Sequence, residues 1–300
     1  MIRRIDVHSL RLFVSAATEG SIARGAAREH IAPSALSRRI ADLEQALGVP
    51  LIIRSPRGIE LTAAGRLVLE RSQEIDREIE GLRREALACG DEISGVVRLA
   101  ANHSSIVGYL PEPLKRYIGA HPQVRVVLSE GDTDDVVQAC LDDRADIGLG
   151  VHTELAERLE RWFFARDPLI VVVPVNHPLV HCDVVRFSDV VQYPLIGIRK
   201  GGSLDGLLSN HRAKLLQSSP DLASDMPVQV GSFDAACRMV EAGLGIVVIP
   251  QSAARAYAGT KKFVRRPLAE DWADRKLYIY ASRKSPRFPA VQALIDRLAG

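Results

Sequence analysis

Serine and arginine side chains share one face of a helix predicted near the start of the chain. Pro33 suits the first helical position, where its missing N–H is not needed. At helical spacing the apolar face is formed by Leu36, Ile40, Leu43 and Leu47, while Ser34, Arg38, Ala41 and Gln45 lie opposite, with Ser37 and Arg39 flanking. A helix that enters the DNA major groove needs short side chains, so that its backbone can approach, and arginines that reach guanine edges or phosphates. This face has both, although an ordinary solvated helix surface is the alternative.

The sequence lacks the patterns expected of a metal site or a catalytic centre. Its four cysteines lie far apart, and none belongs to a CxxC or Cys/His pair with zinc spacing: Cys89, Cys140, Cys182 and Cys237. We expect buried or free thiols. The acidic pairs at 134–135 and 142–143 have the placement of helix-surface charge rather than of catalytic carboxylates. The sequence therefore predicts neither an enzyme nor a bound metal or cofactor.

Composition and charge indicate a globular protein with a basic start. The 300 residues, 47% of them apolar, suffice for two or three domains. Overall net charge is only +2, but nine Arg against six acids give residues 1–62 a charge of +3, which is compatible with nucleic acid without proving it. The longest apolar stretch, 168–175, is far shorter than the roughly 20 residues of a membrane span, and no signal-peptide pattern is present. We expect a cytoplasmic protein without a membrane partner.

Three helices and a hairpin are predicted within the first 62 residues. An apolar stripe marks the first helix: Leu10, Phe13, Val14 and Ala17. Ser21 is a natural N-cap for a short second helix that ends near residue 29 or 30, and the third begins at Pro33. Two short strands follow, at residues 51–54 and 59–61, joined by a turn at residues 55–58. This hairpin would form a wing beside the helices.

A long helix follows the hairpin, and Thr62 can supply its cap. Its apolar and small residues recur at alternating steps of four and three: Val68, Ser72, Ile75, Ile79, Leu82, Ala86 and Cys89. From residue 63 to 89 the helix would be about 40 Å long, too long and too polar to fold back onto a domain of about 60 residues. The narrow seam predicts a partner helix, and a solvated linker is the alternative.

Strands and helices alternate from residue 95 onward. The first set has strands at 96–101, 124–129 and 146–151, with helices near 108–119 and 133–143. The second set has strands at 169–173, 195–199, 228–231 and 244–249, with helices after 203 and near 233–242. A strand at 277–281 and a helix at 287–299 close the chain. This alternation predicts a parallel α/β sheet in two similar halves, with a ligand cleft between them.

The segment 21–40, SIARGAAREHIAPSALSRRI, resembles the helix-turn-helix of LysR-type transcription regulators. Matching points continue along nearly the whole chain: Leu43-Glu44, Leu47-Gly48, Val49-Pro50-Leu51, Arg54, Arg57-Gly58, residues 61–65, Pro111, His121-Pro122, Asp146-Ile147, His177-Pro178 and residues 240–246. The resemblance implies an N-terminal, mainly α winged helix-turn-helix, a long linker helix and a two-lobed α/β effector domain similar to type 2 periplasmic binding proteins. The implied boundaries are 1–62, 63–90 and 91–300, with lobe I at about 91–167 and 267–300 and lobe II at about 168–266.

The resemblance also implies a set of DNA contacts and a mode of assembly. The implied DNA-binding residues are Ser34, Ser37, Arg38 and Arg39 on the third helix, Arg54 and Arg57 on the wing, and Pro33 and Arg24. The chain departs from many relatives at Ala32 and Pro33, where they have Ser and Gln, and at Ile53, where they have Glu. Family members dimerise through the linker helix and form homotetramers, so the expected partners are a partly palindromic double-stranded DNA site, further copies of the chain and RNA polymerase.

In this family a small-molecule effector lies between the two lobes. The matching positions are His103, Ser104, Ser105, Thr133, Gly150, Lys200, Gly201 and Ser203. N–H groups and hydroxyls at helix starts favour an anion, and family effectors are often small carboxylates, so a small organic acid is expected. Plain N-capping is the alternative for the serines and the favoured interpretation for Asp132 and Thr133. His103 has no carboxylate partner visible in the sequence.

Three other classes fit less well. Peroxide-sensing relatives place a reactive cysteine just after the strand at 195–199, where this chain has Ser203, and Cys140 and Cys237 are expected to be buried. A solute-binding transport protein would share the cleft, but it would need a signal peptide and would not carry residues 1–90. An enzyme would need a nucleophile with a base, a metal cluster or paired carboxylates in a loop.

We expect Arg38→Ala to weaken binding to specific DNA more than to non-specific DNA, because its side chain would reach base edges. Arg57→Ala should weaken both together and lower the salt dependence of Kd, because a wing arginine would meet phosphates. Titration of labelled DNA at several salt concentrations measures both effects. Equal behaviour of the two variants would contradict the assignment.

Overall fold

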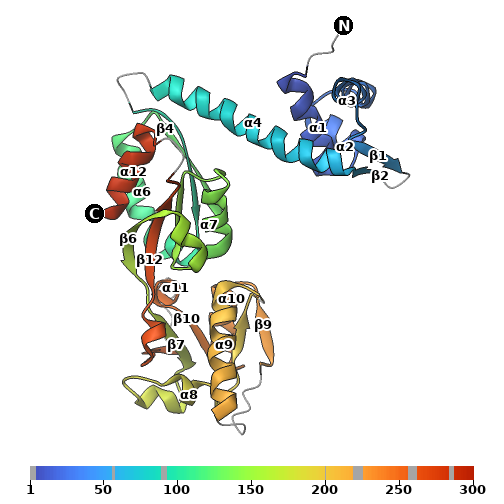
Figure 1. The fold of residues 1–300 in the computed structure, drawn as a ribbon. Coiled ribbons are helices and arrows are strands. Elements are labelled where there is room, and N and C mark those ends of the chain that lie inside the picture. Colours follow the sequence, from blue (N-terminus) through green and yellow to red (C-terminus); the bar gives the residue numbers. More distant parts are fainter. Residues whose placement is uncertain are drawn as a thin grey trace. The chain divides into compact units, whose positions relative to one another are not determined.

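The computed structural model describes residues 5–55, 58–88, 93–199, 201–218, 226–255, 262–283 and 287–300. The chain divides into two compact units, Met1–Cys89 and Gly90–Gly300, whose elements are labelled in Figure 1. Among the described residues, no helix is both long enough and apolar enough to cross a membrane.

Three helices build the core of the first unit: α1 (Val7–Glu19), α2 (Ile22–Arg28) and α3 (Pro33–Leu47). The Ser21 side chain accepts a hydrogen bond from the backbone N–H of Arg24, which confirms it as the N-cap of α2. Gly48 ends α3 in the left-handed region at φ 74°, a conformation that glycine adopts at little cost. The predicted apolar face of α3 is buried in this core, with Leu36 and Ile40 fully covered.

A two-stranded hairpin follows, as the sequence predicts: β1 (Ile52–Ser55) and β2 (Gly58–Leu61), paired antiparallel. One Glu44 carboxylate oxygen on α3 accepts hydrogen bonds from the backbone N–H groups of Leu51, at 2.7 Å, and Ile52, at 3.1 Å. The N–H of Ile59 donates to the carbonyl of Gly20 in the turn before α2, at 3.0 Å. The wing is therefore fixed to the helices at both of its strands, while its turn residues 56 and 57 lie outside the described residues.

The linker helix is α4 (Ala63–Ala88), and the Thr62 hydroxyl accepts from the N–H of Gly65 at its start. Its first half packs against α1, where Val68 joins the core and Ser72 is buried. The expectation that this helix does not fold back onto the small domain is therefore wrong for its first half, because α1 offers it an apolar surface. Farther along the predicted seam, Ile75 is 40% exposed and Leu82 is 67% exposed.

The second unit contains two lobes, each with its own sheet. In lobe I the strand order is β4-β3-β5-β12-β6. Its strands are β3 (Gly95–Ala101), β4 (Val124–Glu130), β5 (Ile147–Val151), β6 (Glu160–Arg166) and β12 (Lys276–Ala281). Its helices are α5 (His103–Gly108), α6 (Pro111–Ala120), α7 (Thr133–Leu141) and α12 (Pro289–Ala299), with the 3-10 turn η1 (Glu154–Arg158).

Lobe II has a three-stranded sheet in the order β10-β7-β11 and a separate pair, β8-β9. The strands are β7 (Leu169–Pro174), β8 (Ile196–Ile198), β9 (Val228–Val230), β10 (Val247–Pro250) and β11 (Phe263–Pro267). The helices are α8 (Phe187–Val190), α9 (Ser203–Ser218), α10 (Phe233–Glu241) and α11 (Gln251–Arg255), with η2 (Pro178–His181) and η3 (Asp271–Ala273).

The prediction of a wholly parallel sheet is wrong in part. Strand β3 pairs parallel with β4 and β5, and β8 pairs parallel with β9. In contrast, β12 is antiparallel to β5 and β6, and β7 is antiparallel to β10 and β11. The chain crosses from lobe I to lobe II after β6 and returns after β11, so the returning strand enters its sheet in the opposite direction.

We expect Gly65→Ala and Gly81→Ala, both within α4, to have opposite effects on stability. Alanine usually stabilises a helix by about 1 kcal/mol relative to glycine. A Cβ at Gly81 would meet no heavy atom within 4 Å, whereas one at Gly65 would lie 2.0 Å from the carbonyl oxygen of Leu51. Chemical denaturation should therefore show a gain for Gly81→Ala and a loss of about 1–3 kcal/mol for Gly65→Ala. A gain from both would show that α4 does not start against the wing.

Candidate functional site

The outward face of α3 is the candidate DNA-binding surface. Pro33, Ser34, Arg38 and Arg39 are exposed, while Ser37 is half-buried. A guanidinium nitrogen of Arg39 lies 3.7 Å from a carboxylate oxygen of Asp6, at the N-terminus of α1. Since the structure gives Arg38 no such acidic neighbour among the described residues, Arg38 is the more available of the two for a nucleic acid.

The remaining predicted DNA contacts differ in their surroundings. Arg24 is exposed, but its guanidinium donates to the carbonyl of Glu19 and lies 3.9 Å from the carboxylate of that residue. Arg54 is exposed on β1, beside Ile53, which is 56% exposed. Arg57 lies outside the described residues.

The candidate effector site lies between the two lobes, where four helices point their N-termini at one cavity. The cavity has a volume of about 160 Å³. Residues of the first turn of each helix line it: His103 and Ser104 of α5, Thr133 of α7, Ser203 of α9 and Phe233 of α10. The N-terminus of a helix carries partial positive charge and unpaired N–H groups. The arrangement therefore favours a negatively charged ligand.

Two of these helix starts are capped and one is not. The side chain of Asn102 accepts from the N–H of Ser105, and Ser232 accepts from the N–H of Ala235. Asp132 occupies the N-cap position of α7 but makes no side-chain cap hydrogen bond. The interpretation of Asp132 as a simple cap is therefore wrong, since its carboxylate instead pairs with Arg199 of lobe II, at 3.3 Å.

The structure brings together four of the eight predicted effector residues, namely His103, Ser104, Thr133 and Ser203. Ser105 is fully buried away from the cavity, and Gly201 lines a neighbouring groove instead. Gly150 does not line the cavity either, but a Cβ there would lie 2.9 Å from a methyl carbon of Thr133, so its lack of a side chain makes room for Thr133. Lys200 lies outside the described residues.

His103 has a carboxylate partner that is not visible in the sequence. Its ring nitrogen Nδ1 lies 2.9 Å from Oε1 of Glu130, which is the last residue of β4. The ring centroid of Phe233, across the cleft on α10, lies 5.3 Å from that of His103. The parallel strands β3 and β4 are neighbours and end side by side. His103 follows the end of β3 and Glu130 ends β4, so this strand pairing could have predicted their contact.

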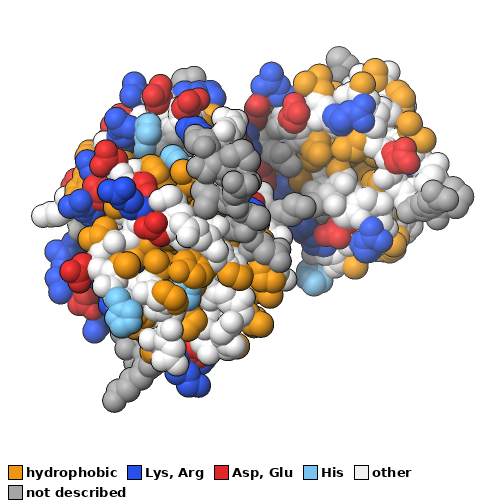
Figure 2. Space-filling model, turned by 90° about the horizontal axis from the view of Figure 1, so that it is seen from below, with side chains coloured by type: hydrophobic (Ala, Val, Ile, Leu, Met, Phe, Trp, Pro, Cys, Tyr) orange, Lys and Arg blue, Asp and Glu red, His pale blue; other side chains and the backbone are white. Residues whose placement is uncertain are grey.

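Arg199 was missed as a site residue although it directly follows β8. Its backbone has φ 35°, an unusual value for an arginine, and the residue lines the cavity. The ion pair with Asp132 joins the lobes directly across the cleft. On the face seen in Figure 2, blue basic and red acidic side chains are interspersed rather than gathered by sign.

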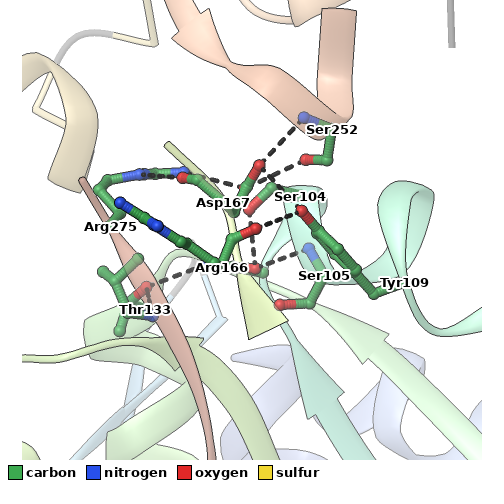
Figure 3. Close-up of polar contacts among 10 residues, drawn as sticks. Ser104, Ser105, Tyr109, Thr133, Arg166, Asp167, Ser252 and Arg275 are labelled. Carbon is green, nitrogen blue, oxygen red and sulfur yellow. Dashed lines mark hydrogen bonds and ion pairs between the residues drawn. The ribbon is translucent and has the colours of Figure 1, made fainter. Parts of the chain in front are cut away.

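Arg275 is a second missed residue, and it belongs to a buried polar cluster where the chain crosses between the lobes (Figure 3). Asp167 is fully buried between β6 and β7, and its carboxylate lies 3.2 Å from the guanidinium of Arg275. Ser252, at the start of α11, donates to the same carboxylate from its N–H and its hydroxyl, both at 3.0 Å. Burial lowers the pKa of the Arg275 guanidinium, although the Asp167 carboxylate opposes this effect. Arg275 also reaches the cavity wall.

The two cysteines expected to be buried are so, and their environment suppresses the thiolate. Burial raises the pKa of Cys140 to about 12 and that of Cys237 to about 11. Cys182 is exposed, and Cys89 lies outside the described residues. Among the residues described, His, Cys, Asp and Glu form no group of three or more that could hold a metal ion.

Two family comparisons match the chain's two units in turn. Residues 7–66 match the bacterial regulatory helix-turn-helix protein, lysR family, and residues 90–300 match the LysR substrate binding domain. The chain belongs to the LysR family. It is therefore a LysR-type DNA-binding transcription regulator with a substrate-binding domain, and not an enzyme.

Individual relatives resemble this LysR-type regulator over nearly its full length or over its second unit. The uncharacterized HTH-type transcriptional regulator YnfL of Escherichia coli (strain K12) is 27% identical over 96% of each chain. Full-length CbnR complexed with its target DNA shares the fold, with a TM-score of 0.72, 20% identity and coverage of 98% of this chain and 99% of that one. The effector binding domain of QuiR in complex with shikimate has a TM-score of 0.58 and 19% identity, and covers 69% of this chain and 96% of that one.

We expect Asp167→Asn to lower the free energy of unfolding of this LysR-type regulator by about 3–5 kcal/mol, because it leaves the buried Arg275 charge unpaired. The double variant Asp167→Asn/Arg275→Met should recover part of that loss, since neither partner then carries a charge. Asp274→Asn, which breaks the exposed pair with Arg166 nearby, is the control and should cost much less. Urea denaturation measures all three, and an equal cost for Asp167→Asn and Asp274→Asn would contradict the role given to the buried pair.

Proposed function

We propose that this LysR-type regulator binds a specific promoter sequence and that a small organic anion, bound between the lobes of its second unit, controls it. The convergence of four helix N-termini on one cavity carries the proposal. Aligned N–H groups in a partly enclosed cavity stabilise negative charge with little rearrangement. A carboxylate is the natural partner for such a site.

The proposed DNA contacts use the exposed face of α3 and the wing. Ser34 and Arg38 would meet base edges, with Ser37 and Pro33 beside them at the helix surface. The arginines Arg24, Arg39, Arg54 and Arg57 would meet phosphates or adjacent base edges. Because Arg24 and Arg39 already have acidic neighbours, their ion pairs must loosen before they bind a phosphate. Phosphate contacts would supply much of the affinity, and base contacts the specificity.

The proposed anion contacts centre on the N-terminal turns of α7 and α9, with Thr133, Ser203 and His103 as polar neighbours. A carboxylate in the cavity would compete with the Asp132 carboxylate for Arg199. Since that ion pair joins the two lobes, its loss on ligand binding would couple occupancy of the cavity to the position of one lobe relative to the other. The structural relative QuiR was solved with shikimate, the anion of a small carboxylic acid, which supports the ligand class without identifying the ligand here.

The proposed assembly rests on the uncovered part of α4. Ile75 and Leu82 lie on its predicted seam and are exposed, although burying them would be favourable. A second copy of the same helix would cover both, which gives a homodimer with two-fold symmetry and a partly palindromic DNA site. We further propose that two such dimers form a homotetramer, which contacts RNA polymerase. The protein would act in the cytoplasm.

Footprinting on the DNA upstream of the protein's own gene tests the function. Protection should be stronger than on random DNA at moderate salt, and small carboxylates should change its pattern. Arg199→Gln should keep the protection but require at least tenfold more carboxylate for the same change, because a charged ligand contact is lost. Arg238→Gln removes an arginine paired with Glu241 on α10 and is the matched control.

Equal affinity for upstream and random DNA would refute sequence-specific regulation at that site. An unaltered carboxylate response in Arg199→Gln would remove Arg199 from the effector site.

A further inference from the structure

A second cavity lies in lobe II, next to the effector cleft and beneath α9. Its volume is about 30 Å³, enough for about two water-sized spheres. Apolar side chains form most of its lining, with Phe187, Leu195, Ile196, Leu204, Leu208 and Val248 among them, and Asp205, Ser209 and Arg212 form the polar remainder. An apolar space of this kind offers water few hydrogen-bond partners. The cavity therefore suits a hydrocarbon group of a ligand.

The two cavities share a wall. Ile198, Leu204 and Asp205 line both of them. One carboxylate oxygen of Asp205 accepts from the N–H of Gly201, at 2.9 Å, which leaves two half-buried aliphatic side chains as the remainder of the wall. Changes of rotamer in such side chains need no movement of the backbone. A ligand in the cleft would need only side-chain movement at Ile198 and Leu204 to reach the side cavity.

A glycine helps to keep the side cavity open. Gly197 is the middle residue of β8 and lines the cavity, and its φ is not in the left-handed region. A Cβ there would meet only flexible side chains, with Cγ of Gln229 at 3.3 Å and Sδ of Met226 at 3.6 Å. Neither the backbone conformation nor a close backbone neighbour requires glycine at this position. Glycine within a strand weakens it and often marks a place where another molecule approaches closely.

We propose that the effector carries a short apolar substituent that occupies this side cavity while its anionic group lies at the helix N-termini of the cleft. The proposal rests on the proposed function and narrows the ligand class to acids with a short alkyl group. It disfavours dicarboxylates, which have no apolar end to fill the space. An unfilled cavity within a core forfeits dispersion contacts that a ligand restores.

Binding of straight-chain carboxylates from acetate to octanoate to the full-length protein, measured by calorimetry, tests the proposal. The corresponding primary alcohols form a second series. In the unsubstituted protein, affinity for the carboxylates should rise about fourfold per added methylene once the chain reaches the side cavity, and it should stop rising when the cavity is full. Carboxylates should bind more tightly than alcohols of equal length.

Two substitutions fill the side cavity from opposite sides: Gly197→Ala from β8 and Leu208→Phe from α9. Each should flatten the dependence on chain length while leaving the affinity for acetate within about twofold. Gly119→Ala, in α6, is the matched control, because a Cβ there meets no heavy atom within 4 Å. Circular dichroism establishes that each variant is folded, and the two filling variants provide independent readings.

The outcomes separate this proposal from the proposed function. If affinity is the same for every chain length, or if both filling variants keep the full dependence on length, the side-cavity proposal is overturned. If alcohols show a length dependence that the filling variants lose, but carboxylates bind no better than alcohols, the side cavity stands and the anion site fails. If carboxylates bind equally well at all lengths, the anion site stands alone.

Discussion

The buried ion pair between Asp167 and Arg275 is the interaction on which the second unit most depends. One partner lies where the chain leaves lobe I and the other where it returns, so the pair ties both crossings together. Two charges removed from water are tolerated only when the geometry is good and hydrogen bonds satisfy what remains. Ser252 supplies two of those bonds from α11 of lobe II. Because Arg275 also lines the cavity, the ion pair at the crossings and the ligand site share a residue.

The cleft balances charge on both of its sides. Helix N-termini and Arg199 favour an anion, while Glu130 and Asp132 lie among them and accept from His103 or pair with Arg199. These carboxylates keep the polar groups of the cavity satisfied before any ligand arrives. A ligand anion therefore gains affinity only by the difference between its own contacts and those that it displaces. This requirement favours ligands that add apolar contacts to their charged ones.

Local signals allowed the first unit to be predicted closely, and non-local pairing explains most of what was missed in the second. Ser21 and Pro33 mark helix starts through their own chemistry, and the structure places the starts there. Strands β6 and β11, by contrast, carry arginines at half-exposed or exposed positions, so their alternation of apolar and polar residues is weak. The pairs His103–Glu130 and Arg199–Asp132 join residues 27 and 67 positions apart. No spacing rule within one element finds them.

The close contact between Gly65 and Leu51 has a consequence for the operator. Because α4 starts directly against the wing and Glu44 binds the wing to α3, these two elements and the first half of α4 form one rigid body. This body cannot adjust to DNA by bending between α4 and the wing. In the proposed dimer, the distance between two half-sites would then be set where the two α4 helices cross. Adding or deleting base pairs between half-sites would have to be absorbed by the DNA itself, through twist or curvature.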